Sequence, residues 1–136
     1  MTTIDQRLTE AVLDSFERVF GKRPAFAQIQ IQTTRQEFEG DRTLVVFPLA
    51  GLAGKPPHVA AHMLGEALVE SCDWIDSFDV VKGFLNLTLS SACWKESLIE
   101  ALASPSWGHA QPGSRSKVMV EYSSPNTNKP LHLGHL

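Results

Sequence analysis

Apolar side chains recur every three or four residues over the first twenty positions, which predicts an amphipathic helix over residues 3–20. Its apolar face carries Ile4, Leu8, Ala11, Val12, Ser15, Phe16, Val19 and Phe20. Thr3 and Gln6 have the spacing of a capping box, and Gly21 follows at the usual end of a helix. We expect this face to pack on the rest of the domain; a helix that binds a partner is the alternative.

The next stretch alternates apolar and polar residues. Residues 28–32 predict a strand with one wet face, and residues 43–47, apolar on both faces, predict a central strand. A charged turn over residues 37–42 joins them into a hairpin. Residues 50–57 are rich in glycine and proline, so we expect a loop there.

The helical period returns over residues 57–71 and 91–103, and two strands, residues 77–82 and 84–90, meet at Gly83 between these helices. The expected buried positions are Ala60, Met63, Leu64, Ala67 and Leu68 in the first helix, and Trp94, Leu98, Ala101 and Leu102 in the second. His58 and His62 lie one turn apart and are expected to be solvated surface residues, with a functional pair as the alternative.

This order of elements predicts an α+β fold, a two-layer domain in which a four-stranded, mainly antiparallel sheet carries helices on one face. The domain occupies residues 1–103. Residues 104–116, rich in proline, glycine and serine, are expected to be a linker in which Trp107 is exposed unless it docks on a neighbour. A second fold would begin at residues 117–136.

Composition narrows the class of protein. The chain has 136 residues, 12 basic and 15 acidic side chains, and a net charge of -3, which argues against a free-standing nucleic-acid binder. No charged-then-apolar leader and no apolar run near the roughly 20 residues of a membrane span occur, so we expect a cytoplasmic protein without a membrane partner. Cys72 and Cys93 lack metal or redox spacing and are expected to be reduced thiols.

The strand over residues 84–90 offers one candidate site. Its three leucines share one face, so Phe84, Asn86 and Thr88 share the other. An aromatic ring beside an amide on an open sheet face can stack on a base and hydrogen-bond to it. From the pattern alone, a plain solvated strand is favoured over this base-reading pair.

The C-terminal residues offer a second candidate site. Residues 117–122 predict a short buried strand, residues 123–130 a polar turn, and the last six residues the start of a helix. A helix N-terminus is suited to phosphate, and His132, Gly134 and His135 lie at that end. The two imidazoles can donate to phosphoryl oxygens, and the glycine lets a flat ring approach the backbone. The alternatives to a phosphate site are that the two histidines form half of a metal site or that they are solvated surface residues.

These residues carry a resemblance to a known family. His132-Leu133-Gly134-His135 is similar to the HIGH signature of class I aminoacyl-tRNA synthetases, with leucine in place of isoleucine. Glu121-Tyr122-Ser123-Ser124-Pro125-Asn126 resembles the arginyl-tRNA synthetase version. Gly83-Phe84-Leu85-Asn86 is similar to a segment of the N-terminal domain of those enzymes.

The resemblance implies roles in ATP chemistry. His132 and His135 would stabilise the charge that builds on the α-phosphate of ATP during attack by the amino-acid carboxylate. Lys129 would assist with the phosphates, and Gly134 would lie under the adenine. No protein metal site is implied, and Mg²⁺ is expected with the ATP.

The resemblance also implies two binding sites. Glu121, Ser124 and Asn126 match positions that hold arginine, the glutamate supplying negative charge. Phe84 and Asn86 match a segment whose asparagine contacts the outer corner of the tRNA.

We therefore expect the N-terminal piece of an arginine–tRNA ligase, made of the additional N-terminal domain and the truncated start of a Rossmann-like catalytic domain at residues 117–136. The parent would be a monomer that uses ATP, L-arginine and tRNA-Arg. The piece alone is expected to be inactive and to hold no cofactor, with residues 123–136 mobile. The alternatives are another class I synthetase or adenylyl-transferring enzyme, and a non-catalytic RNA-binding module.

Overall fold

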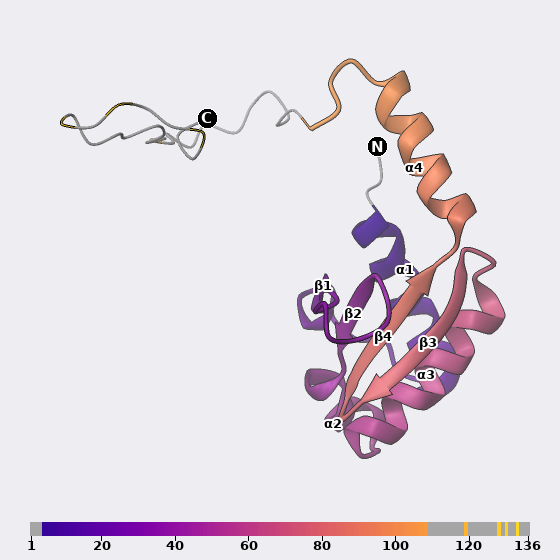
Figure 1. Ribbon diagram of the computed structural model, residues 1–136. Coiled ribbons are helices and arrows are strands. Elements are labelled where there is room, and N and C mark those ends of the chain that lie inside the picture. The colour runs from indigo at the N-terminus through magenta and orange to yellow at the C-terminus, as the bar shows by residue number, and fades with distance from the viewer. Residues whose placement is uncertain (1–3, 109–118, 120–127, 129, 131–132, 134–136) are drawn as a thin grey trace. The chain divides into compact units, whose positions relative to one another are not determined.

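The computed structural model describes residues 4–108 and the single positions 119, 128, 130 and 133 (Figure 1). Residues 1–105 form one compact unit, and the elements below all belong to it. They are α1 (Ile4–Phe20), the 3₁₀ turn η1 (Phe26–Gln28), β1 (Ile31–Thr33), β2 (Arg42–Val45), α2 (Phe47–Ala53), α3 (Pro57–Ser71), β3 (Ile75–Val81), β4 (Phe84–Leu89) and α4 (Ser91–Ala103).

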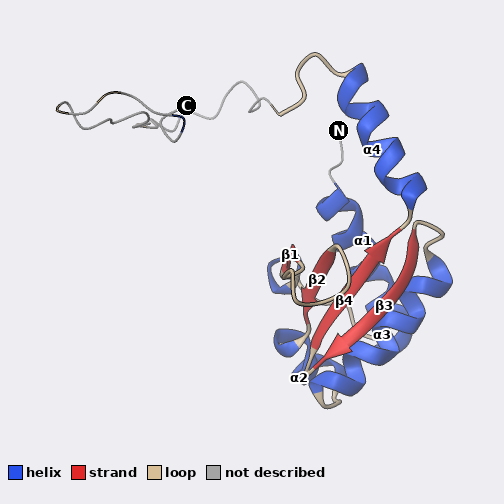
Figure 2. Cartoon of the chain, in the orientation of Figure 1, coloured by secondary structure: helices blue, strands red, loops and turns tan. Residues whose placement is uncertain are grey.

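The four strands form one sheet in the order β1-β2-β4-β3, and every pairing is antiparallel. Helices α1 and α3 pack together on one face of this sheet (Figure 2). This confirms the predicted two-layer α+β domain and the central position of β2. Strand β4 also lies inside the sheet, between β2 and β3, so its residues are neighbours of segments from both hairpins.

The core lies between the sheet and these two helices. Leu85, Leu87 and Leu89 of β4 all point into it, as their period of two predicts. Helix α1 contributes its apolar face, and α3 approaches β3 closely, because a Cβ added at Gly65 would lie 2.5 Å from the ring of Phe78. The largest fully buried side chains are Phe16, Leu8, Leu44, Leu49, Leu64, Leu68, Leu85, Leu87, Val12 and Val46.

Several sequence-based boundaries are wrong: those around α2 and β1 differ most, while β2 ends at Val45 instead of 47 and β3 begins at Ile75 instead of 77. Where a loop over residues 50–57 was expected, helix α2 occupies residues 47–53, because Pro48 suits a first helical turn and Leu49 is fully buried. The helix ends at Gly54, which has the left-handed conformation common at helix ends. The strand expected at residues 28–32 starts only at Ile31, because Gln28 ends η1 and its side chain accepts a hydrogen bond from the Ala25 N–H.

Helix α4 has the predicted bounds but a different environment. Trp94, Leu98 and Leu102 were expected to be buried, and all three are exposed. The helix extends beyond the edge of the sheet, so only Cys93, in its first turn, reaches the core (Figure 1). The expectation failed because a 3.6-residue period shows which face is apolar and does not show whether anything lies against it.

His58 and His62 are exposed, as expected. No helix in the described part of the chain is both long and apolar enough to cross a membrane. Among the same residues, no group of three potential metal ligands comes together. The predicted strand at residues 117–122 and the mobility of residues 123–136 fall almost wholly outside the described residues.

Candidate functional site

Thr43 and Asn86 lie opposite each other on the sheet face that α1 and α3 do not cover. They are register partners in the pairing of β2 with β4. The hydroxyl Oγ1 of Thr43 donates to Oδ1 of Asn86 at 2.7 Å. Both side chains are almost inaccessible to solvent, at 4% and 2% exposure. The expectation of a plain solvated strand, and of an open face, is therefore wrong at Asn86.

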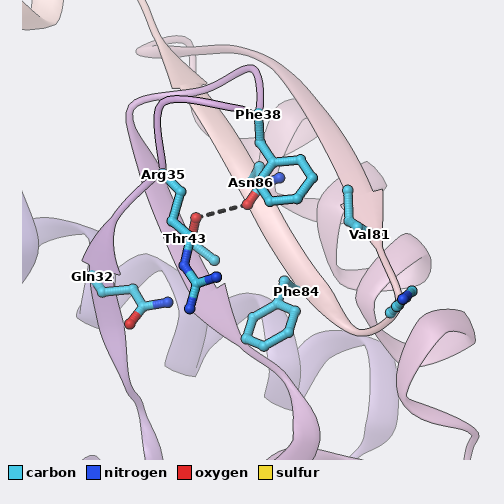
Figure 3. Close-up of a pocket in the computed structure, with 8 residues that line it drawn as sticks. Gln32, Arg35, Phe38, Thr43, Val81, Phe84 and Asn86 are labelled. Atoms are coloured by element: carbon cyan, nitrogen blue, oxygen red, sulfur yellow. Dashed lines mark hydrogen bonds between the residues drawn. The ribbon is translucent and has the colours of Figure 1, made fainter.

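Asn86 is buried because the loop between β1 and β2 folds over it (Figure 3). This covering loop consists of residues 34–41. Asp41 anchors its end, since the Asp41 N–H donates to the carbonyl of Leu87 at 2.8 Å and Asp41 Oδ2 accepts from the Leu89 N–H at 2.8 Å. At the other end the Thr34 N–H donates to the Asp41 carbonyl at 3.3 Å. The loop is thus fixed to β4 through the backbone N–H and the carboxylate of Asp41.

A pocket of about 320 Å³ opens beside the covering loop, which is near the lower limit of roughly 300–1,000 Å³ for small-ligand sites. Two aromatic rings contribute to it, Phe38 from the loop and Phe84 from the start of β4 (Figure 3). Phe84 is supported from behind by Phe47, with ring centroids 5.3 Å apart in an edge-to-face arrangement. The pocket is lined by Gln32, Arg35, Phe38, Thr43, Val81, Lys82, Phe84 and Asn86.

The Asn86 side chain has one unsatisfied group. Its Oδ1 accepts from Thr43, whereas its Nδ2 is buried and has no hydrogen-bond partner among the described residues. A buried amide without a partner costs about 1–3 kcal/mol, so such groups are few in folded proteins. Asn86 lines the pocket, but this nitrogen is itself shielded from solvent, so an acceptor can pair with it only when the covering loop shifts.

Two positively charged side chains line the pocket, Arg35 and Lys82. Lys82 occupies the tight turn between β3 and β4 with φ of 58°, a conformation that lysine seldom adopts. Gly83 follows it with φ of 122°, and a Cβ there would lie 2.9 Å from Pro57. The turn therefore requires glycine at its second position, and it keeps a lysine at its first position in spite of the backbone strain.

Of the residues that sequence analysis placed in sites, Phe84 and Asn86 are described and lie together in this pocket. Glu121, Ser124, Asn126, Lys129, His132, Gly134 and His135 lie outside the described residues. Sequence analysis missed Phe38, Thr43, Arg35 and Lys82. A single phenylalanine within the charged stretch 35–42 was the one available signal, because an aromatic residue without apolar neighbours is unusual in a turn.

Comparison with known proteins gives one consistent family. A sequence model described as "Arginyl tRNA synthetase N terminal domain" matches residues 3–89. The chain is 42% identical over 134 residues to an arginine–tRNA ligase of Parabacteroides distasonis and 44% identical over 134 residues to one of Bacteroides fragilis. These alignments cover 98% of this chain and 22% of each relative, so the chain spans about a fifth of their length.

A solved structure agrees with the sequence comparison. The arginyl-tRNA synthetase of Thermus thermophilus matches 98% of this chain and 21% of its own chain, with 27% identity and a TM-score of 0.55. The matched region includes both central strands of the sheet, and hence the strands that carry Thr43 and Asn86.

Proposed function

This chain belongs to the arginyl-tRNA synthetase family, and from that premise we propose that it is the N-terminal part of an arginine–tRNA ligase. The parent protein activates L-arginine with ATP, releases pyrophosphate and transfers arginine to tRNA-Arg. Mg²⁺ accompanies the ATP, and the parent acts as a cytoplasmic monomer. The chain spans about a fifth of the length of its relatives, and in this proposal it has no ligase activity by itself.

In this proposal the catalytic residues lie in the C-terminal segment. His132 and His135 donate hydrogen bonds to the α-phosphate as negative charge builds on it, and such stabilisation is usually the largest single contribution to catalysis. Lys129 adds positive charge near the phosphates, and Gly134 leaves room for the adenine. Glu121, Ser124 and Asn126 hold the arginine.

The compact domain has a separate task, which is to bind one nucleobase from the outer corner of the tRNA. The observation that carries this step is the buried, unpaired Nδ2 of Asn86 in a pocket that also holds the rings of Phe38 and Phe84. Stacking on an aromatic ring contributes about 1–3 kcal/mol per base. When the covering loop shifts to admit the base edge, the unpaired Nδ2 of Asn86 gains a partner from it.

The charge of the chain limits how strong this contact is. A net charge of -3 gives little attraction to phosphate overall. Arg35 and Lys82 supply positive charge at the pocket itself, so the contact is local. We expect weak binding by the isolated chain and a larger contribution within the parent, where the catalytic part holds the rest of the tRNA.

The activity is tested by amino-acid-dependent ATP–pyrophosphate exchange with the full-length protein, using all twenty amino acids with and without tRNA. Exchange with arginine alone supports the proposal, and we expect it to require tRNA. His132→Ala or His135→Ala should reduce exchange by about 10²-fold or more. Exchange with another amino acid would replace the substrate, and no exchange under any condition would favour a non-catalytic RNA-binding module.

The tRNA contact is tested in the 136-residue chain by nuclear magnetic resonance. Titration with tRNA-Arg at low salt should shift the signal of the Asn86 side-chain amide and of the backbone amides in residues 38–43 and 82–86. Shifts that are absent at Asn86, or spread evenly over the chain, would remove this role. An elongator tRNA with a different base at the outer corner is the matched control and should shift Asn86 less.

A further inference from the structure

Two threonine hydroxyls continue the polar network behind Asn86. Oγ1 of Thr34, at the start of the covering loop, lies 3.0 Å from Oγ1 of Thr43. Oγ1 of Thr43 lies 2.7 Å from Oδ1 of Asn86 and donates to it. Three side chains, from β4, β2 and the covering loop, are thus joined in one line of hydrogen bonds.

The direction of this line follows from counting protons. A threonine hydroxyl has a single proton and can donate only one hydrogen bond. Thr43 gives its proton to Asn86, so it must accept from Thr34, which is the donor of the second bond. The line therefore runs from Thr34 through Thr43 to Oδ1 of Asn86.

We propose that Thr43, supported by Thr34, is a positioning residue that fixes the orientation of the Asn86 amide and thereby sets which nucleobase edges the pocket accepts. This inference rests on the proposed tRNA contact. With Oδ1 held by Thr43, both protons of Nδ2 remain for the ligand. The base must then present an acceptor, a ring nitrogen or a carbonyl oxygen, opposite this nitrogen.

The opposite orientation of the amide would give the opposite preference. Nδ2 would then donate to Thr43, and Oδ1 would face the pocket and select a donor such as an exocyclic amino group. The two orientations have the same shape, so only hydrogen bonding chooses between them. Thr43 is well suited to this task, because it is buried in a central strand and its β-branched side chain has few rotamers.

The other side of Asn86 does not compete for its nitrogen. Asp79 of β3 is its register partner there, and it is exposed. Nδ2 makes no hydrogen bond to Asp79 or to any other described residue. The orientation of the amide therefore depends on the threonine side alone, and a change at Thr43 should act on specificity.

The test uses the 136-residue chain and the 5′-monophosphates of adenosine, guanosine, cytidine and uridine. Dissociation constants come from the shift of the Asn86 side-chain amide signal. The best-binding nucleotide is then compared with analogues in which one acceptor at a time is removed or weakened: deaza forms, in which C–H replaces a ring nitrogen, and thio forms, in which sulfur, a weaker acceptor, replaces a carbonyl oxygen. We expect one analogue to bind on the order of tenfold more weakly than its parent nucleotide, because Nδ2 is left buried and unpaired.

Thr43→Val removes the hydroxyl and keeps the shape of the side chain. In this variant the affinity ratio between the best nucleotide and its acceptor-deleted analogue should fall toward one, since the amide is free to turn. Thr43→Ser keeps the hydroxyl and should retain the ratio. Thr88→Val, on the same face of β4 outside the pocket, is the matched control and should also retain it.

The outcomes separate this inference from the function on which it rests. If no nucleotide and no tRNA shifts Asn86, the tRNA contact itself fails. If nucleotides bind and Thr43→Val keeps the full ratio, or if no acceptor-deleted analogue binds more weakly to the unchanged chain, only the positioning role is overturned. Should Thr43→Val fail to fold, Thr34→Val decides the question, because Thr34 is only half-buried, and a lowered ratio is expected there too.

Discussion

Gly40 lies directly against Asn86: a Cβ at Gly40 would be 3.3 Å from the Cβ of Asn86 and 3.2 Å from the carbonyl oxygen of Leu87. Its φ of 118° belongs to a region that other residues rarely adopt. Glycine at this position therefore lets the covering loop close over β4 without backbone strain or a crowded contact. The close approach of Gly40 thus contributes to the burial of Asn86, together with the hydrogen bonds that Asp41 makes to β4.

Gly40→Ala should lower the free energy of unfolding by about 1–3 kcal/mol, because the new methyl group combines backbone strain with a close contact. Urea denaturation measures this change. Faster hydrogen exchange of the Asn86 amide should show that the covering loop has moved away from β4. Gly51→Ala is the control, since Gly51 lies in α2 with nothing within 4 Å of an added Cβ. That control should leave stability unchanged or raise it by up to about 1 kcal/mol. Equal effects at the two sites would contradict the role of Gly40.

Phe38→Leu and Phe84→Leu should each weaken tRNA binding by about 5- to 100-fold, because leucine keeps apolar volume and loses the stacking surface. Phe38→Leu is the cleaner test, since Phe84 also packs on Phe47 within the domain. Phe26→Leu is the control, as Phe26 is 64% exposed and lies outside the pocket. Fluorescence titration at fixed salt measures all three. Similar losses for Phe26 and Phe38 would show that the rings do not stack on a base.

Lys82→Asn should separate stability from binding. Asparagine tolerates a positive φ better than lysine, so we expect the free energy of unfolding to stay equal or to rise by a few tenths of a kcal/mol. The affinity for tRNA should fall, and the slope of log affinity against log salt should become smaller in magnitude by about one. Lys95→Gln, on the exposed surface of α4, should change neither quantity. An unchanged salt slope for Lys82→Asn would mean that Lys82 contacts no phosphate.

The Cys93 thiol gives a prediction about pH. Burial raises the pKa of this thiol above its usual value, and the nearby Arg7 opposes that shift. The unfolded chain therefore loses the proton at a lower pH than the folded chain, so folding stability should be constant below the usual thiol pKa and should decline as pH rises above it. Urea denaturation at pH 7, 8, 9 and 10 measures this decline.

Cys93→Ala should remove that part of the decline at a cost of about 1 kcal/mol at neutral pH. The same substitution at Cys72 is the comparison, because it changes the other buried thiol and leaves Cys93 in place. Alkylation at pH 8 should modify Cys93 only as fast as the domain opens. Rapid modification of Cys93 in the folded chain would contradict its burial in the core.

Local patterns in the sequence determined much of the domain. The bounds of α3 and α4, the inward-facing leucines of β4 and the antiparallel hairpins all follow from periods of 3.6 and 2 together with turn residues. These features depend on neighbours within a few positions along the chain. The resemblance of residues 83–86 to a segment of the arginyl-tRNA synthetases likewise identified Phe84 and Asn86 as a candidate pair.

Tertiary structure decided the features that depend on residues far apart in the chain. Thr43 meets Asn86 only because β4 is inserted between β2 and β3, and Asn86 is buried only because residues 34–41 fold over it. In the same way, α4 has an apolar face whose exposure no local pattern could show. The sequence thus determined which side chains have the right chemistry. The packing of distant segments decided which of them share a pocket and which of their hydrogen bonds stay open, because burial and pairing depend on the whole chain.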